Sequence, residues 1–376
     1  MLDSIKELIV TSGFMNMTIQ ELIVVILSLI LIYLAVSKNY EPYLLIPIGF
    51  GMLLANLPLT GLMDIPTATS NGGLLYYLYQ GVSLGIFPPL IFLCLGAGTD
   101  FGPLIANPKT LLLGGAAQFG IFAAFFGALA LGMTPSESAA IGIIGGADGP
   151  TALHSSAILA EHLLPTIAIA AYSYMALVPI IQPPIMRLLT TEEERKTVMT
   201  QSRAVSKKEK ILFPIIVTIF VSLLIPSSTP LIGMLMLGNL IRESNVVPLL
   251  ADTLENSMMY IITILLGISV GASANAELLL STATLKIIFL GLFSFSMGTA
   301  TGVLMGKLMY KITGGKINPL IGSAGISAVP MAARVSQVEG IKANPNNYLL
   351  MHAMGPNVAG VIGSAVSAGI LIHFFG

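Results

Sequence analysis

An all-α polytopic membrane protein is the fold class that the sequence predicts, and three observations carry this prediction. Of the 376 residues, 55% are hydrophobic and only 9% are charged, against roughly 25% charged in soluble domains. Apolar stretches follow one another along the chain, enough for about ten to twelve membrane elements when a full span takes ~20 residues. Motifs of the first half also recur in the second. A lipid bilayer is therefore the expected environment of most of the chain.

Charge and cysteine content exclude several classes of protein. Lysine and arginine nearly balance aspartate and glutamate, so the formal net charge is only -1. This balance excludes the basic surface of a nucleic-acid-binding protein. The single cysteine, Cys94, lies in an apolar run. It excludes a disulfide framework and a cysteine-rich metal centre.

The predicted elements begin with one N-terminal transmembrane helix over about 17–36, within a first unit 1–40. Several of the later apolar segments are too short to span a bilayer alone, which predicts broken helices and re-entrant hairpins. These segments lie at about 43–58, 82–97, 109–132, 136–146, 151–186, 211–226, 230–241, 257–272, 282–310, 318–335 and 347–375.

The one hydrophilic stretch, 187–210, is rich in lysine and arginine and divides the remaining chain into 41–186 and 211–376. By the positive-inside rule it faces the cytoplasm. Lys38 and the later lysines at 307, 311 and 316 predict the same side for their loops. The N-terminus is then expected on the outside.

The two halves resemble each other in three motifs. Residues 51–57 recur as 233–240, an offset of 233 − 51 = 182, and 95–98 recur as 270–273, an offset of 270 − 95 = 175. A looser match joins 145–152 to 322–330. Their common order indicates two structural repeats, 41–186 and 211–376, as in transporter-like folds.

Asp148 is the most deeply set charge of the first repeat. Glycines and Pro150 interrupt the helix around it in Gly-Gly-Ala-Asp-Gly-Pro-Thr-Ala, 145–152. A carboxylate in mid-membrane costs about 2.5–3.5 kcal/mol on insertion scales, which favours a functional role. The alternative is an aspartate that only caps the helix that follows it.

The second repeat has matching breaks that carry further oxygen atoms. Asn318 precedes a proline, Ser323 and Ser327 follow it, and Asn357 stands in Met-Gly-Pro-Asn at 354–357. Together with Asp148, amide, hydroxyl and freed backbone oxygens are the hard ligands of a small cation, and no histidine–cysteine cluster competes for a transition metal. Alternatively, both asparagines are plain cap or turn residues.

Tyr174 and Arg334 are two further candidates. Tyr174 lies inside an apolar run, where it either takes part in the chemistry or only packs. Arg334, in Met-Ala-Ala-Arg-Val, either binds an anion or anchors the chain at the cytoplasmic surface.

These motifs resemble one family. The segments 96–103, 145–152, 318–334 and 354–358 are similar to those of the beta subunit of the sodium-pumping, biotin-dependent decarboxylases, over nearly the whole chain. The resemblance implies a membrane subunit that decarboxylates carboxybiotin and exports sodium, with a scaffold part and a mobile core part. Known members serve oxaloacetate, methylmalonyl-CoA or glutaconyl-CoA.

The resemblance also assigns roles to residues of this chain that occupy the functional positions of the family motifs. The resemblance implies that sodium is bound by Asp148, Asn318, Gly322, Ser327 and Asn357. It also implies that Tyr174 takes part in proton or ion handling and that Arg334 holds the carboxybiotin. Asp148, Tyr174 and Arg334 would then be catalytic.

The resemblance also implies cofactors and partner subunits for this chain. The sodium ion and biotin are the expected cofactors, with biotin carried as carboxybiotin on a partner subunit. The expected partners are a carboxyltransferase alpha subunit, a biotin carrier subunit and a small gamma or delta membrane subunit, around a homotrimer of this chain in a prokaryotic cytoplasmic membrane. The rival hypothesis is a sodium-coupled secondary carrier of a small organic anion without decarboxylase activity; a passive channel fits a capped carboxylate less well.

Overall fold

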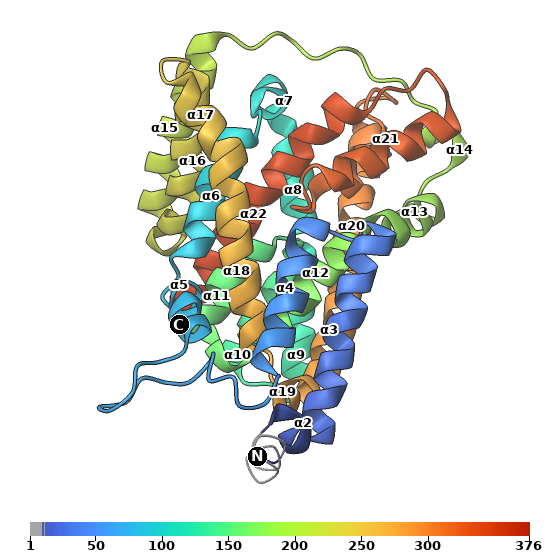
Figure 1. Cartoon of the computed structure of the whole chain (residues 1–376). Helices are drawn as coiled ribbons and strands as arrows, with labels where there is room; N and C mark the ends of the chain where they lie inside the picture. Colours follow the sequence, from blue (N-terminus) through green and yellow to red (C-terminus); the bar gives the residue numbers. More distant parts are fainter. Residues whose placement is uncertain (1–9, 11) are drawn as a thin grey trace.

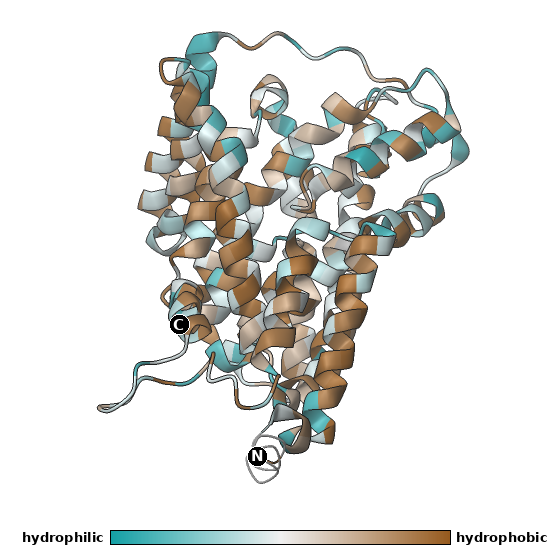
Figure 2. Ribbon diagram, viewed as in Figure 1, coloured by the Kyte–Doolittle hydropathy of each residue, from teal (hydrophilic) through white to brown (hydrophobic). Residues whose placement is uncertain are grey.

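The computed structural model describes residue 10 and residues 12–376, and the regular secondary structure of this part is all helical, without a β-strand (Figure 1). Five helices are long and apolar enough to cross a membrane, and two bent helix pairs raise the number to seven. Figure 2 shows that apolar residues cover the outside of these helices, while hydrophilic residues gather at the two ends of the molecule. The predicted all-α polytopic fold is confirmed.

The N-terminal helix forms as predicted. α3 (Ile19–Lys38) begins in a capping box in which Thr18 and Glu21 exchange hydrogen bonds, and it ends at Asn39 in a left-handed conformation. α4 (Pro42–Ala55) turns back and packs against it. The outer side of α3 is apolar and exposed, as a lipid-facing helix requires.

The helices in the rest of the first half are shorter than the apolar segments that the sequence predicted there. A helix that the sequence did not indicate, α5 (Leu74–Ser83), precedes α6 (Phe87–Gly98) at a bend of 66°. Prolines near the starts of α12 and α13 divide the predicted apolar segment 151–186 into three helices. The helices of this region are α7 (Gly102–Ala106), η1 (Pro108–Thr110), α8 (Leu111–Ala117), α9 (Phe119–Ala130), α10 (Pro135–Gly142), η2 (Ile143–Gly146), α11 (Gly149–Leu159), η3 (Glu161–Leu163), α12 (Leu164–Ala176) and α13 (Val178–Leu189).

The second half starts after the charged stretch. A short helix, α14 (Glu192–Arg195), is followed by an extended segment to α15 (Lys207–Leu224). The remaining helices are η4 (Pro226–Ser228), α16 (Thr229–Ser244), α17 (Pro248–Thr253), η5 (Leu254–Met258), α18 (Met259–Ser273), α19 (Ala276–Leu279), α20 (Thr282–Ile312), η6 (Pro319–Gly325), α21 (Met331–Ala343) and α22 (Leu350–Phe375).

One end of the molecule carries the charged segments. Lys307 on α20 donates a hydrogen bond to Leu189 O at 3.0 Å and pairs with Glu194 at 3.4 Å. This end holds the 187–210 segment, and the N-terminus lies at the opposite end (Figure 1). We call the former the cytoplasmic end, because the positive-inside rule assigns it there.

Two reciprocal contacts support the interpretation as repeats. Asn56, at the end of α4, donates from Nδ2 to Ala274 O at 2.8 Å, and Asn239 on α16 donates from Nδ2 to Thr99 O at 3.0 Å. The two acceptors are 274 − 99 = 175 residues apart, the offset seen between the sequence motifs. α6 rises between α5 and α7 while α18 descends between α17 and α19 (Figure 1). We infer that the repeats are inverted.

Candidate functional site

Two hairpins that enter from opposite ends meet at the centre of the protein. The first comprises α10, η2 and α11, and the second comprises η6 and α21. Their tips are joined by a backbone hydrogen bond of 2.9 Å from Ser327 N–H to Gly146 O. Glycine also lets the first hairpin pack closely on α9, since a Cβ atom on Gly145 would overlap the backbone of Gly120. Broken backbone is tolerated at this depth because protein surrounds it.

Asp148 lies at this crossing and is only 4% exposed. It is the N-cap of α11, where Oδ1 accepts a hydrogen bond from Thr151 N–H at 3.3 Å. Its Oδ2 accepts a second bond, from the Ser364 hydroxyl of α22, at 2.7 Å. The capping alternative is therefore realised, but it uses only one of the two carboxylate oxygens.

Residues from distant parts of the chain complete the crossing. The Ser327 hydroxyl donates to Ser364 Oγ at 3.0 Å. Asn357 Nδ2 donates to Ala324 O at 3.1 Å and to Ile326 O at 2.8 Å, and so holds the tip of the second hairpin. Ser327 is thus linked to Asp148 through Ser364, while Asn357 contacts the tip of the second hairpin that carries Ser327.

Several buried oxygens here have no hydrogen-bond partner among the described residues. They are Asn357 Oδ1, Gln118 Oε1, Thr151 Oγ1 and the Tyr172 hydroxyl. A Cβ atom on Gly146 would lie 3.4 Å from Gln118 Oε1, which places this oxygen at the hairpin tip. Buried polar atoms without partners are costly, and orphaned amide and hydroxyl oxygens beside a carboxylate suit a small hard cation.

A cavity of about 170 Å³ opens on one side of Asp148. One wall comes from the turn before α4 and from α6, α16 and α18; the other comes from α11, α12, α22 and the residues after η6. Tyr172 and Ser327 line this cavity with Asp148. The cavity therefore separates two helix groups that each provide polar atoms.

Tyr174 does not reach this cavity. Its hydroxyl donates to Ile288 O on α20, and its ring lies against Gly291. Tyr172, two residues earlier, faces Asp148 instead: a Cβ atom on Gly149 would overlap its ring. Two positions on a helix differ by about 200°, so only one of the two tyrosines can face the site. The sequence signal, a Tyr-Ser-Tyr run, did not distinguish them.

Asn318 and Gly322 lie on the cytoplasmic side of the hairpin rather than beside Asp148. The Asn318 amide donates to Arg195 O at 2.9 Å and to Thr197 O at 2.8 Å, while its Oδ1 accepts from Leu320 N–H. Gly322 permits close contact with the backbone of Gly302 on α20. The structure does not bring the Asn318 side chain to the carboxylate.

Arg334 is exposed on α21, and its guanidinium has no hydrogen bond or ion pair to the described residues. It borders a surface pocket of about 320 Å³ with apolar walls from Pro179, Pro183 and Val338. Lys342 adds a second cation to this pocket. Such a pocket suits an anion that carries an apolar ring system.

Comparisons with known proteins identify the family of this chain. A family model described as the Na+-transporting oxaloacetate decarboxylase beta subunit matches residues 20–375. The chain belongs to this beta-subunit family.

Three relatives illustrate the match. Methylmalonyl-CoA decarboxylase subunit beta of Propionigenium modestum is 58% identical, with 100% of each chain covered. Glutaconyl-CoA decarboxylase subunit beta of Acidaminococcus fermentans is 56% identical over 99% of this chain and 98% of its own. Oxaloacetate decarboxylase beta chain 2 of Salmonella typhi is 48% identical over 99% of both. The family predicted from the motifs is confirmed, and with it the assignment to decarboxylases and sodium transport.

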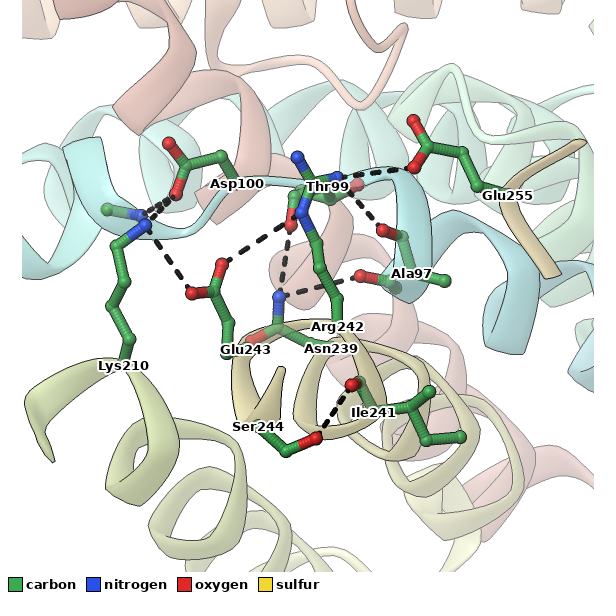
Figure 3. Close-up of polar contacts among 12 residues, drawn as sticks. Ala97, Thr99, Asp100, Lys210, Asn239, Ile241, Arg242, Glu243, Ser244 and Glu255 are labelled. Atoms are coloured by element: carbon green, nitrogen blue, oxygen red, sulfur yellow. Dashed lines mark hydrogen bonds and ion pairs between the residues drawn. The ribbon is translucent and has the colours of Figure 1, made fainter. Parts of the chain in front are cut away.

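In this beta subunit, Asp100, which stands in one of the family motifs, belongs to a polar network with residues of α15 and α16 (Figure 3). Lys210 reaches Asp100 at 3.0 Å and Glu243 at 3.5 Å, and Arg242 donates to Ala97 O at 2.9 Å. Burial alone would raise the pKa of Asp100, but the Gly102 N–H bond and the Lys210 ammonium group outweigh it and lower the pKa below its usual value. The network fixes α15 and α16 to the end of α6.

A second polar group lies beside the Arg334 pocket of the beta subunit. Glu339 accepts two bonds from the Arg187 guanidinium, at 2.7 and 2.9 Å, and one from Lys342 at 2.9 Å. Burial would raise the pKa of Glu339, but the two cations outweigh it and hold that pKa below its usual value. Glu339 thus ties α21 to α13, and it leaves Arg334 as the unpaired cation of the pocket.

Proposed function

We propose that this beta subunit decarboxylates carboxybiotin delivered by a biotin carrier subunit and couples the reaction, with consumption of one proton, to the export of sodium ions. The observation that carries the proposal is the crossing of the two hairpins, where the Asp148 carboxylate meets hydroxyl and orphaned amide oxygens. The names of the relatives, decarboxylase beta subunits of a Na+-transporting family, supply the reaction class.

Sodium would bind at the crossing. Asp148, Ser327 and Asn357 are the proposed ligands from the predicted set, and Ser364 and Gln118 join them on geometric grounds. For Asn318 and Gly322, both predicted as ligands, we propose the role of holding η6 in place. For Tyr174 we propose a place on the route of ions or protons behind α12 rather than at the carboxylate.

A proton links the ion to the chemistry. A buried carboxyl group is held neutral by its low-dielectric surroundings, and a bound cation favours its ionised form. Sodium entry at Asp148 therefore releases one proton. Decarboxylation breaks the bond between the biotin nitrogen and the carboxylate carbon, leaves the electron pair on nitrogen as CO2 departs, and takes up one proton to form neutral biotin. Turnover would thus consume the proton that sodium displaced.

Arg334 would hold the carboxybiotin. Its helix, α21, lies toward the cytoplasmic end (Figure 1), and the exposed guanidinium can offer two parallel hydrogen bonds to the carboxylate of a carboxybiotin on a soluble carrier. The apolar walls of the pocket suit the biotin rings. Moving one sodium ion against 100 mV costs about 2.3 kcal/mol, so the irreversible loss of CO2 has to drive the movement of the loaded site.

The proposed assembly follows from the name of the family. A beta subunit works with other subunits; we propose a carboxyltransferase alpha subunit, a biotin carrier subunit and a small gamma or delta membrane subunit, around a homotrimer of this chain in the cytoplasmic membrane. The alpha subunit would select the carboxylic acid or acyl-CoA. The rival carrier hypothesis would not require a biotinylated partner.

Sodium uptake into proteoliposomes that contain the purified complex tests the proposal. Uptake driven by oxaloacetate, methylmalonyl-CoA or glutaconyl-CoA is the expected result, and avidin, which blocks biotin, should abolish it. Sodium exchange that needs no decarboxylation and is insensitive to avidin would favour the carrier instead.

A further inference from the structure

The two helices that form the Arg334 pocket, α13 and α21, both contact η6 at one residue, Ser323. From α13, the Gln182 amide donates to Ser323 O at 2.8 Å and to Thr299 Oγ1 on α20 at 3.4 Å. From α21, the Ser336 hydroxyl lies 2.9 Å from Ser323 Oγ. Gln182, Ser323 and Ser336 are fully buried. Both walls of a surface pocket are thus tied to the same buried residue.

Gln182 occupies the turn of α13 that also supplies the pocket wall. Pro179 and Pro183, on either side of it in the chain, line the pocket. A proline inside a helix has no N–H to donate, so Pro183 and Pro184 interrupt the backbone hydrogen bonds of this turn. Helices bend at such prolines. A ligand that presses on the pocket wall therefore acts on the part of α13 that carries Gln182.

The amide of Gln182 is a costly choice for a residue that only packs. Its Oε1 is buried and has no hydrogen-bond partner among the described residues. An unpaired buried acceptor is destabilising, whereas a leucine of similar size would avoid this loss. The glutamine is therefore better explained by the bond from its Nε2 to the hairpin than by stability.

Ser323 adjoins the proposed ion site. It directly precedes Ala324, whose carbonyl oxygen accepts a hydrogen bond from the Asn357 amide at 3.1 Å. Asn357 is one of the proposed sodium ligands, so a displacement of Ser323 changes a contact that positions a ligand. A continuous series of contacts therefore connects the wall of the Arg334 pocket to the ion site.

We infer that Gln182 is a positioning residue that couples occupancy of the Arg334 pocket by carboxybiotin to the sodium affinity of the Asp148 site, an inference that rests on the proposed function. Carboxybiotin between α13 and α21 fixes the spacing of these helices, and Gln182 and Ser336 pass this spacing on to Ser323. The hairpin then holds the ion ligands in the geometry that binds sodium. Because coupling between two binding sites is reciprocal, bound sodium also favours carboxybiotin in the pocket.

The test measures the sodium requirement of the purified complex for decarboxylation of free carboxybiotin, at low and at saturating carboxybiotin. In the wild type, saturating carboxybiotin should lower the sodium concentration for half-maximal activity by about fivefold or more, as coupled sites do. In Gln182→Leu the difference should be less than about twofold. Gln337→Leu on α21 is the matched control, because its amide bonds to Asn347 O and Leu350 N–H instead of to η6, and it should keep the wild-type difference.

Sodium protection against thermal unfolding, measured without carboxybiotin, is the second readout. Gln182→Leu should be protected at the same sodium concentrations as the wild type, because the proposed ion ligands are all present. A merely structural role would lower the stability and leave the coupling intact. Ser336→Ala, on the other wall of the pocket, should also reduce the coupling, and this smaller change decides the matter where Gln182→Leu does not assemble.

The outcomes distinguish this inference from the proposed function. A wild-type difference that persists in Gln182→Leu, or its absence from the wild type, overturns the inference while sodium-dependent decarboxylation upholds the proposed function. Loss of sodium protection in Gln182→Leu would place the residue in the frame of the ion site and also overturns the inference. A wild-type complex that does not decarboxylate free carboxybiotin in response to sodium overturns the proposed function, and the inference falls with it.

Discussion

The Ser364 hydroxyl lies 2.7 Å from Oδ2 of Asp148, although the two residues are 216 positions apart in the chain. Ser364 also receives a hydrogen bond from Ser327, so one hydroxyl connects the two hairpins through α22. Neither the motifs nor the resemblance pointed to Ser364. The Asp148 carboxylate of the first repeat is therefore held by two segments of the second: by α22 directly, through Ser364, and by the second hairpin indirectly, through Ser327.

Ser364→Ala should raise the sodium concentration needed for half-maximal decarboxylation by roughly ten- to a hundredfold, because a hydrogen bond to a charged group contributes about 1.5–3 kcal/mol. The measurement is a sodium titration of the activity of the complex. Ser367→Ala, on the same buried part of α22 but without a hydrogen bond to Asp148, is the matched control. Equal titrations of the two variants would remove Ser364 from the site.

Asp148→Asn should abolish sodium-dependent decarboxylation while expression and assembly stay nearly intact. The amide keeps the N-cap bond to Thr151 but removes the charge that binds the cation and releases the proton. Sodium-stimulated turnover of the purified complex is the measurement, and its survival in this variant would refute the assignment of the ion site.

Asn357→Ala and Asn318→Ala should differ, although the sequence predicted one role for both. Asn357→Ala should increase the sodium requirement, because Asn357 holds the hairpin tip and presents an orphaned oxygen. Asn318→Ala should leave the sodium requirement unchanged and lower stability by about 1–3 kcal/mol, since two hydrogen bonds to the 187–210 segment are lost. Sodium titration and thermal unfolding of the same preparations check this. A shared sodium effect would restore the original prediction.

Arg334→Lys should recover only part of the decarboxylation of free carboxybiotin that Arg334→Ala loses. Lysine offers a point charge where the planar guanidinium can form two parallel bonds. Sodium protection against heat should persist in both variants, because the proposed ion ligands are untouched. Loss of both properties together would place Arg334 in the fold or at the ion site; loss of neither would make it a surface anchor.

The Asp100–Lys210 pair should contribute stability only above acidic pH. The pKa of Asp100 is lower in the folded protein than its usual value, so the contribution is complete above about pH 4 and is lost as the pH falls through the folded value. The Asp100 side chain is 43% exposed, so we expect only about 0.5 kcal/mol. Thermal unfolding of Asp100→Asn should show this deficit at neutral pH and none in acid. Glu277→Gln, exposed at the other end, is the control.

The sequence alone predicted the membrane environment of the chain and the positions of its helix breaks. Composition placed the chain in lipid, because charged side chains are costly there. Glycine and proline marked the breaks at 145–150 and 318–325, since these residues interrupt helices wherever they occur. Asp148 could be singled out because it is a charged residue at one of these breaks in an apolar segment. The division of the apolar segment 151–186 into three helices was not predicted, because its prolines fall at helix starts, where they are tolerated.

Only the tertiary structure decided which side chains share the site. Helices that are apolar on every side have no sequence periodicity that reveals their inward face. The packing of distant helices therefore decided three things that the sequence could not show. Tyr172 rather than Tyr174 lies beside Asp148, Asn318 lies away from it, and Ser364 donates a hydrogen bond to it. Nothing in the sequence singled out Glu41, and only the packing of α4 against α18 and α12 places this residue at the cavity. The sequence by itself determined the membrane environment and the helix breaks, and packing between segments hundreds of residues apart determined the geometry of the proposed ion site.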